Sequence, residues 1–331
     1  VLYFFFRTKL SLGKYLLKNK YNKIEKGYVY FVDAMIAVAN KDNKTALRSH
    51  KKMNNYLKDD QSLSLLLKSE VFKIEKNFKL GKVINYRGIK KGIENTNYYL
   101  EFKDKKTVLT IFEKRVNKKD LPFFMKLMYG LSKLKIKCPG PVKSINGSYL
   151  IKLKNKNACI VSFLHGKDKK TLSPKDCYIV GKNIARLHNA SKKLKLYRKN
   201  ALAVPKLNKL LASINKKINK VQKNILGDMR NEYKFLKRLW PKYLNSGIIH
   251  CDLFIDNIFF YKKKYYGFID FYFSANDFLA YELATCVNAL CFKKRNKVFV
   301  LDKNKSAQLL RGYQSIRKLN SKEKSNFNTL C

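Results

Sequence analysis

Three polar side chains with the types and spacing needed for phosphoryl transfer lie between residues 248 and 272, in the stretch IIHCDLFIDNIFFYKKKYYGFIDFY. Asp252 could orient a hydroxyl nucleophile and take its proton, and Asn257 and Asp270 could hold Mg²⁺ against nucleotide phosphates. A buried polar hairpin capped by Asp and Asn would use the same residue types. Because several spacings agree with a single chemistry, the stretch favours a phosphotransferase loop.

The pattern of apolar residues around these side chains predicts a β-hairpin. Its strands are expected at residues 258–261 and 265–269, with a turn through residues 262–264. Such a hairpin would bring the three polar side chains to one end of the structure. The spacing His-x-Asp-x-x-x-x-Asn, which begins at His250 and is followed by Asp-Phe, is typical of a kinase catalytic loop and its metal-binding Asp.

The composition limits the class of protein. With 331 residues, of which 46% are hydrophobic and 13% aromatic, the chain can build a large core, and this excludes wholesale disorder. The net charge of +49 comes mostly from Lys spread evenly among Asn, Ile, Tyr and Phe, while Arg is scarce, so we expect no specific nucleic-acid partner. The seven Cys have no CxxC spacing and there are only four His, which favours free thiols in a reducing cytoplasm over structural zinc.

A short helix at residues 71–78 and then a run of strands with one helix are predicted before residue 162. The strands are expected at residues 81–86, 98–102, 107–113, 149–153 and 158–163, and the helix at residues 121–134, with Asp120 as its N-cap. Gly88 and Gly92 flank a polar turn whose backbone N–H groups could close over phosphates, because Gly has no Cβ to obstruct them. This order of elements is that of a kinase small lobe. Residues 162–164 would be the hinge, whose backbone meets the adenine edge of a nucleotide.

Helices dominate the predictions for the rest of the chain. Ser173 and Pro174 would open a helix that runs to Ser191, and His188 on this helix is expected to be a structural partner. Further helices are expected at residues 206–220, 221–239, 276–292 and 306–317. Asp277 would lie near the start of the helix at residues 276–292, where it could cap that helix and brace the catalytic loop.

Residues 1–68 have a different, helical character. Two amphipathic segments joined by a polar turn fit one tetratricopeptide-like repeat and resemble the membrane-anchored tetratricopeptide proteins associated with haem biosynthesis operons. Residues 1–6 are too few to span a bilayer, but basic residues follow them, as at the end of a membrane anchor. Membrane association is expected only if this segment is a genuine anchor. The chain starts with Val and stops after a helix-like stretch, so we expect a C-terminal truncation and a joined reading frame near residue 68.

Five segments resemble, in this order, the bacterial homoserine kinases built on the aminoglycoside/choline kinase fold: GIKKGIENTNYYLEF, LPFFMKLMYGL, GKNIARLHNAS, HCDLFIDNIFF and IDFYFSANDFLAYELA. The resemblance covers residues 69–330. It implies an α+β, protein-kinase-like bilobal fold of the aminoglycoside phosphotransferase type, with a small lobe at residues 69–161 and a large lobe at residues 162–331. It also implies phosphorylation of the small molecule L-homoserine to O-phospho-L-homoserine for threonine biosynthesis, with ATP and Mg²⁺ as cofactors and a cytoplasmic location for the kinase part.

Roles can be carried over by position from this resemblance. Asp252 would be the catalytic base, His250 would pack behind the loop and hold its backbone, and Asn257 and Asp270 would hold Mg²⁺. The ATP-binding residues would be Gly88, Gly92, Asn95, Asn97, Lys114, Ser162 and Leu164. Homoserine is a zwitterion, so its site needs a carboxylate clamp and an ammonium acceptor. The candidates for these contacts are Glu94, Asn97, Tyr272 and Asp277.

The chain departs from protein kinases at the clamp on the α- and β-phosphates. Thr110 stands where a Lys is expected on the third strand, and the nearest basic residue on the same face is Lys114. The following helix has no Glu, and Asp120 at its start is the nearest acid. Two alternatives stay open. One is another small-molecule kinase of the same fold, of the choline, methylthioribose or aminoglycoside type, although choline would need an aromatic cage. The other is a membrane-tethered helical-repeat scaffold with an inactive kinase lobe, against which the complete set of loop residues argues.

Overall fold

The computed structural model describes residues 71, 73–89, 95–113, 116–153, 155–214, 218–219, 224–296 and 298–331. The described chain divides into two compact units, a smaller one of residues 71–113 and 142–163 and a larger one of residues 116–141 and 164–331. The helical repeat and the membrane anchor expected within residues 1–68 lie outside the described residues. Within the described ranges, no helix combines the length and the apolar composition that crossing a membrane requires.

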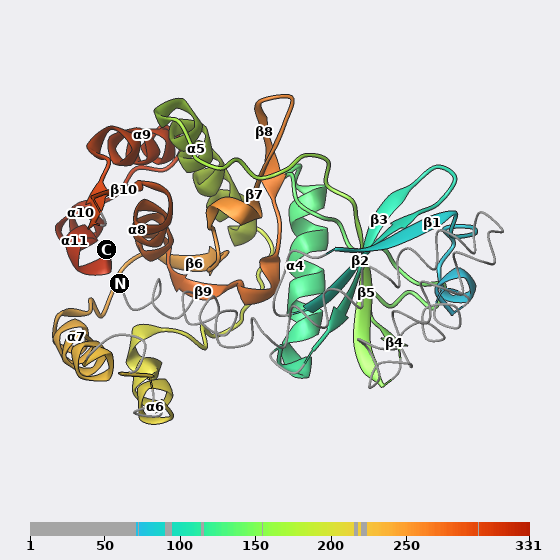
Figure 1. Ribbon diagram of the computed structural model, residues 1–331, viewed down its shortest axis with the longest axis horizontal. Helices are drawn as coiled ribbons and strands as arrows, with labels where there is room; N and C mark the ends of the chain where they lie inside the picture. Colours follow the sequence, from blue (N-terminus) through green and yellow to red (C-terminus); the bar gives the residue numbers. More distant parts are fainter. Residues whose placement is uncertain are drawn as a thin grey trace. The chain divides into compact units, whose positions relative to one another are not determined.

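The smaller unit is built on a five-stranded antiparallel sheet in the order β1-β2-β3-β5-β4 (Figure 1). The strands are β1 (Asn85–Ile89), β2 (Asn95–Glu101), β3 (Lys106–Phe112), β4 (Ile151–Leu153) and β5 (Lys156–Ser162). Alternation along β2 places Tyr98 and Leu100 in one buried cluster with Leu109 of β3. Ile74 and Phe78, from the helical residues 73–77 and the turn after them, complete this core.

The first strand is the element of this unit that differs most from the prediction. It was expected at residues 81–86, but β1 begins at Asn85, which pairs with the last residue of β2, Glu101. Just before β1, the N–H of Ile84 still donates to the carbonyl oxygen of Glu101 over 2.8 Å, but the regular pairing with β2 ends there, and Gly81 has a left-handed φ of 84°. As a result Gly88 lies inside β1, opposite Tyr98, rather than beside the turn. The other predicted strands and the predicted helix are confirmed to within three residues at each end.

The larger unit is mainly helical. Its helices are α4 (Leu121–Lys133), α5 (Pro174–Lys192), α6 (Leu207–Ala212), α7 (Ile225–Leu239), α8 (Leu279–Leu290), α9 (Lys303–Gln314), α10 (Ser321–Ser325) and α11 (Phe327–Leu330). Its strands pair as β6 (Ser246–Ile249) with β9 (Ala275–Phe278), β7 (Ile258–Tyr261) with β8 (Lys264–Phe268), and β10 (Phe292–Arg295) with β11 (Val298–Leu301). α4 belongs to this unit, although residues 121–134 were expected in the small lobe. The boundary between the units follows Phe163, inside the segment expected to be the hinge.

Helices α5 and α9 pack against each other at close range (Figure 1). A Cβ atom added at Gly181 of α5 would collide with the carbonyl oxygen of Leu309, and one added at Gly312 of α9 would collide with the carbonyl oxygen of Tyr178. The backbones can approach this closely only because both positions are Gly. Buried side chains of the two helices are thereby brought into hydrogen-bonding range.

The helix starts show which predictions depended on local residues. Ser173 caps α5 as predicted, because its hydroxyl accepts from the N–H of Asp176 over 3.1 Å. α9 begins at Lys303 rather than residue 306, since Asp302 caps it. The prediction of a helix from residue 276 was wrong in its first turn. Residues 275–278 instead form β9, which pairs with β6, so Asp277 does not cap α8.

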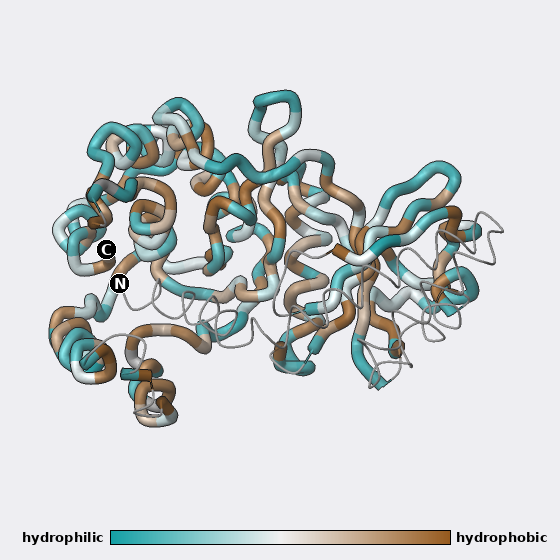
Figure 2. Tube along the Cα trace, in the orientation of Figure 1, coloured by the Kyte–Doolittle hydropathy of each residue, from teal (hydrophilic) through white to brown (hydrophobic). Residues whose placement is uncertain are grey.

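The β7–β8 hairpin changes from hydrophobic at its base to hydrophilic at its tip (Figure 2). At the base, Ile258 and Phe268 are paired and fully buried. At the tip, Lys262 and Lys263 have φ values of 48° and 64°, as in a two-residue type I′ turn. Lys264, expected in the turn, instead pairs with Tyr261 as the first residue of β8. The hairpin is therefore anchored in the core at the end that carries the predicted catalytic residues.

Candidate active site

The β6–β9 pair and the hairpin hold the predicted loop residues at one end of the hairpin. β6 leads directly into the loop that contains Asp252, and its partner β9 follows shortly after Asp270. The N–H of Ile269 donates to the carbonyl oxygen of Asn257 over 3.0 Å. Asn257 and Asp270 therefore occupy neighbouring positions on the two ends of the hairpin, as its apolar pattern predicted.

Asn257 holds Asp252 through a single nitrogen atom. Its Nδ2 donates to the backbone carbonyl oxygen of Asp252 and to the Asp252 carboxylate, both over 2.7 Å. Because both partners are acceptors, the orientation of the Asn257 amide is determined, and its oxygen is the atom left to face a cation. Asn257 is buried, so it keeps the Asp252 carboxylate in one place.

His250 lies behind the loop and does not reach solvent, with an exposure of 0%. Its Nδ1 accepts from the N–H of Asp252 over 3.3 Å, and its Nε2 lies 2.9 Å from the carbonyl oxygen of Ile269. These partners require the hydrogen on Nε2. The ring also packs on Phe271, with 4.4 Å between ring centroids. This geometry suits a residue that holds the loop backbone, and it keeps His250 away from a bound substrate.

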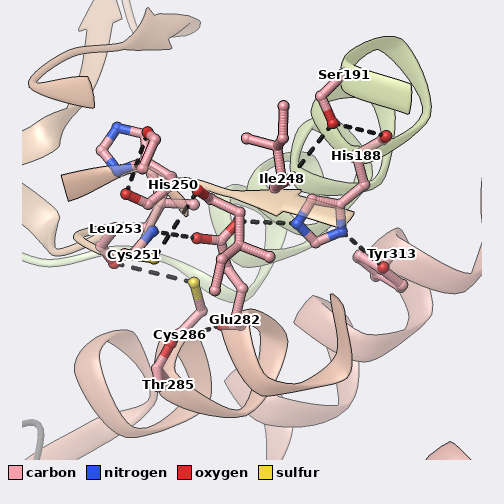
Figure 3. Close-up of polar contacts among 12 residues, drawn as sticks. His188, Ser191, Ile248, His250, Cys251, Leu253, Glu282, Thr285, Cys286 and Tyr313 are labelled. Carbon is pink, nitrogen blue, oxygen red and sulfur yellow. Dashed lines mark hydrogen bonds and ion pairs between the residues drawn. The ribbon is translucent and has the colours of Figure 1, made fainter. Parts of the chain in front are cut away.

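Cys251, between the two loop residues, adopts a strained backbone conformation. Its φ of 65° is in the left-handed region, which costs energy for a residue other than Gly. Its N–H donates over 2.8 Å to Oε1 of Glu282 in α8, which is 1% exposed (Figure 3). The other carboxylate oxygen of Glu282 lies 2.8 Å from Nε2 of His188, so His188 is a structural partner, as expected. Glu282 was missed from the sequence, although a single acid inside the apolar run LAYELATCVNAL signals a buried carboxylate with partners.

A second residue missed from the sequence, Arg198, supports the segment after Asp270. Its Nη1 donates to the carbonyl oxygens of Phe273 and Ser274 over 3.2 and 3.0 Å, and its Nε donates to Asp120 over 2.8 Å. Asp120 occupies the N-cap position of α4, as expected, but its side chain makes no cap hydrogen bond, because its carboxylate forms this ion pair. Nothing in the local sequence around Arg198 distinguishes it from the other basic residues.

Two candidate homoserine contacts in the larger unit already have protein partners. The carboxylate of Asp277 accepts from Nδ2 of Asn200 over 2.7 Å and from the N–H of Phe278 over 2.8 Å. Burial raises the pKa of Asp277, and these hydrogen bonds offset only part of that effect. Tyr272 makes an edge-to-face contact with Phe124 of α4, with 6.0 Å between ring centroids.

The described candidate ATP-binding residues of the smaller unit lie on β1 (Gly88), β2 (Asn95 and Asn97) and the end of β5 (Ser162). Thr110, the residue in place of the expected Lys, is 2% exposed and donates to Oδ1 of Asn97 over 2.8 Å. The side-chain oxygen of Asn95 is buried and has no hydrogen-bond partner among the described residues. Three further candidates lie outside the described residues, and these are Gly92, Glu94 and Lys114.

The donor atoms of the loop fit a magnesium ion. Mg²⁺ prefers oxygen ligands and is usually held by one or two carboxylates together with substrate phosphates and water. The Asn257 amide oxygen and the Asp270 carboxylate are ligands of this kind, and the nitrogen of the same Asn257 amide donates to the Asp252 carboxylate. The site therefore combines two candidate ligands of one metal ion with a carboxylate whose position is fixed by hydrogen bonds.

Comparison with known families gives one match over most of the described chain. Residues 85–319 match the model of a family described as "Phosphotransferase enzyme family". The chain is 39% identical over 246 residues to a homoserine kinase of Rhizobium etli, and the match covers 74% of this chain and 76% of that protein. It is 38% identical over 248 residues to homoserine kinases of Brucella canis and Brucella suis, with 75% of each chain covered.

Solved structures with a similar fold are kinases of small molecules. The amicoumacin kinase in complex with AMP-PNP and Ca²⁺ superposes with a TM-score of 0.61 at 15% identity, and the match covers 80% of this chain and 81% of that one. An aminoglycoside-3′-phosphotransferase of type VIII superposes with a TM-score of 0.55 at 15% identity, with coverage of 82% and 98%. At this level of identity the likeness concerns the fold, and it confirms the predicted α+β, kinase-like class.

Proposed function

Because the chain belongs to the phosphotransferase enzyme family and is 38–39% identical to homoserine kinases over three quarters of its length, we propose that it phosphorylates L-homoserine. The γ-phosphoryl group of ATP passes to the side-chain hydroxyl of homoserine, and the products are O-phospho-L-homoserine and ADP. The observation that supports this reaction best is the pair of 2.7 Å hydrogen bonds with which Asn257 holds Asp252.

Asp252 orients the homoserine hydroxyl toward the γ-phosphorus and accepts its proton. A carboxylate is too weak a base to remove a proton from a free alcohol, so the proton leaves late, as the new O–P bond forms. The main contribution of Asp252 is therefore to position the nucleophile. Asn257 keeps the carboxylate from rotating, and His250 holds the backbone on the other side of Asp252.

Asn257 and Asp270 are the residues that would hold Mg²⁺. The ion, when bound, neutralises charge on the nucleotide phosphates. Asp270 has a left-handed φ of 66°, and the carbonyl groups after it are held by Arg198, so the protein fixes the backbone at this ligand. This support for one metal ligand is independent of the support for Asp252.

In the smaller unit, the proposed nucleotide contacts are made by backbone and amide groups. Gly88 in β1 and the side-chain amides of Asn95 and Asn97 would lie along the phosphates. Gly92, which precedes Asn95 in the sequence, and Lys114, which follows β3, are the other proposed contacts of the phosphates. The buried side-chain oxygen of Asn95, which has no partner among the described residues, is suited to a polar ligand. Ser162, the last residue of β5, and Leu164 would present backbone groups to the adenine. The proposed contacts of homoserine are the sequence candidates Glu94, Tyr272 and Asp277.

The test is an acceptor-dependent ATPase assay. ADP release from Mg-ATP is followed with L-homoserine, L-serine, choline or no acceptor, for the unmodified chain and for Asp252→Asn. We expect homoserine-dependent turnover that falls at least ~100-fold in the variant, as for loss of a general base. Asp256→Asn is the matched control, because Asp256 is an exposed acid of the same loop. Turnover with choline or serine but not homoserine would overturn the acceptor, and equal rates in both variants would overturn the role of Asp252.

A further inference from the structure

A continuous chain of buried hydrogen bonds links the end of α9 to the catalytic loop, and Figure 3 shows it from Tyr313 to Cys251. Nη1 of Arg317 donates to the Tyr313 hydroxyl over 3.1 Å, and that hydroxyl lies 2.9 Å from Nδ1 of His188. Nε2 of His188 lies 2.8 Å from Oε2 of Glu282, whose Oε1 accepts from the N–H of Cys251 over 2.8 Å. All five residues are buried. His188 lies in α5, Glu282 in α8, Tyr313 in α9, Arg317 just after α9, and Cys251 in the loop itself.

One arrangement of hydrogen atoms pairs every group in this chain. Arg317 can only donate, so the oxygen of Tyr313 accepts from it. The hydroxyl hydrogen of Tyr313 then goes to Nδ1 of His188, and Nε2 carries the hydrogen that goes to Glu282. Burial raises the pKa of Tyr313, so the phenol keeps its hydrogen at neutral pH. His188 is thus held as the neutral tautomer that donates to Glu282.

Tyr313 therefore holds the side of the His188 ring that faces away from Glu282. Without the hydroxyl, Nδ1 would be a buried acceptor with no donor, and the ring would be held through Nε2 alone. The ring could then turn about that single contact with Glu282. The carboxylate would no longer be held at both oxygens, and its contact with the N–H of Cys251 would loosen.

We propose that Tyr313 is a positioning residue for Asp252, and that it acts by fixing His188 and, through it, the carboxylate of Glu282 beneath Cys251. The strained, left-handed backbone at Cys251 persists only where surrounding contacts hold it, and Asp252 is the next residue. A looser contact at Cys251 therefore moves the Asp252 carboxylate. The catalytic part of this proposal rests on the proposed role of Asp252 in phosphoryl transfer.

The first test compares Tyr313→Phe with Tyr281→Phe. Tyr281 is a matched control because it is also buried, it precedes Glu282 in α8, and its ring packs edge-to-face on Trp240. We expect Tyr313→Phe to lower kcat about tenfold, as for loss of one hydrogen bond, with KM for ATP and for homoserine within about twofold of wild type. The control should change neither constant by more than about twofold. A loss of stability alone would lower the number of active sites and leave KM unchanged, so kcat is calculated per nucleotide-binding site counted by titration. A purely structural loss would leave kcat per site unchanged.

The second test needs no turnover. Nitrogen-15 shifts of His188 in the unmodified chain should show the neutral ring with hydrogen on Nε2, and hydrogen exchange at the Cys251 amide should become about tenfold faster in Tyr313→Phe. If exchange responds in this way while homoserine supports no turnover, the proposed function fails and the link from Tyr313 to Cys251 stands. A doubly protonated His188, a hydrogen on Nδ1, or exchange and kcat equal to those of Tyr281→Phe would overturn the proposal.

Discussion

Replacement of Glu282 by Gln changes the charge of one buried side chain while keeping its shape. The two oxygens of Glu282 accept from Cys251 and from His188, each over 2.8 Å. Gln has one oxygen and one NH₂ group, so it can accept from only one of these donors. At the other, its own N–H would face a donor, and one hydrogen bond would be lost.

The size of the effect follows from these two contacts. A hydrogen bond to a charged group contributes about 1.5–3 kcal/mol, and a buried donor left without a partner costs about 1–3 kcal/mol. Removal of the buried charge also relieves some desolvation cost, which places the net loss of unfolding free energy at about 2–4 kcal/mol. At about 2–4 °C per kcal/mol for a unit of this size, Tm should fall by about 4–16 °C.

The assay is thermal unfolding followed by circular dichroism, with Glu232→Gln as the matched control. Glu232 lies on α7 in the same unit, at a partly exposed position, where such a substitution changes stability by no more than about 0.5 kcal/mol. In addition, kcat should fall in Glu282→Gln because Cys251 loses a charged acceptor. The reasoning would be refuted if both variants melted within about 2 °C of each other.

Two further predictions concern helix α5 and its packing. Burial raises the pKa of Asp176, but hydrogen bonds from Lys169 and Ser173 outweigh this and leave the pKa below its usual value. The ionised carboxylate therefore stabilises the fold above about pH 4, and this contribution is lost as pH falls through the lowered pKa. Asp176→Asn should consequently shift the urea midpoint more at pH 7 than at pH 3. Equal shifts at the two pH values would contradict this prediction. Gly312→Ala should lower the unfolding free energy by about 1–3 kcal/mol, because the Cβ of the alanine would meet the Tyr178 carbonyl. An unchanged urea midpoint would show that α5 and α9 are not in close contact.

Short-range patterns in the sequence were enough to predict the catalytic loop and the hairpin after it. The alternation of apolar residues in β7 and β8, and the spacing from Asp252 to Asn257, concern residues within a few positions of one another. Turn and strand preferences at this range depend mainly on local sterics and on burial of one face. The cap of α5 at Ser173 was predictable for the same reason. The homoserine kinase relatives confirm the expectation drawn from the five segments.

The errors occurred where a partner distant in the sequence decided the conformation. The prediction of helix at residues 276–278 was reasonable from their neighbours, but pairing with β6 makes them strand. Asp120 is a suitable N-cap by type, yet Arg198, 78 residues away, takes its carboxylate. In both cases a long-range hydrogen bond or ion pair replaced the local one, and a local pattern carries no information about which will form.

The sequence by itself determined which residues could perform phosphoryl transfer and the order of the elements that carry them. Only the tertiary structure decided how those residues are held. Glu282 reaches Cys251 across 31 positions of sequence, and Tyr313 reaches His188 across 125. A buried polar group must find a partner wherever the fold places one, because leaving it unpaired away from water costs more than most single contacts contribute. The support of the catalytic loop is therefore a property of packing between α5, α8 and α9.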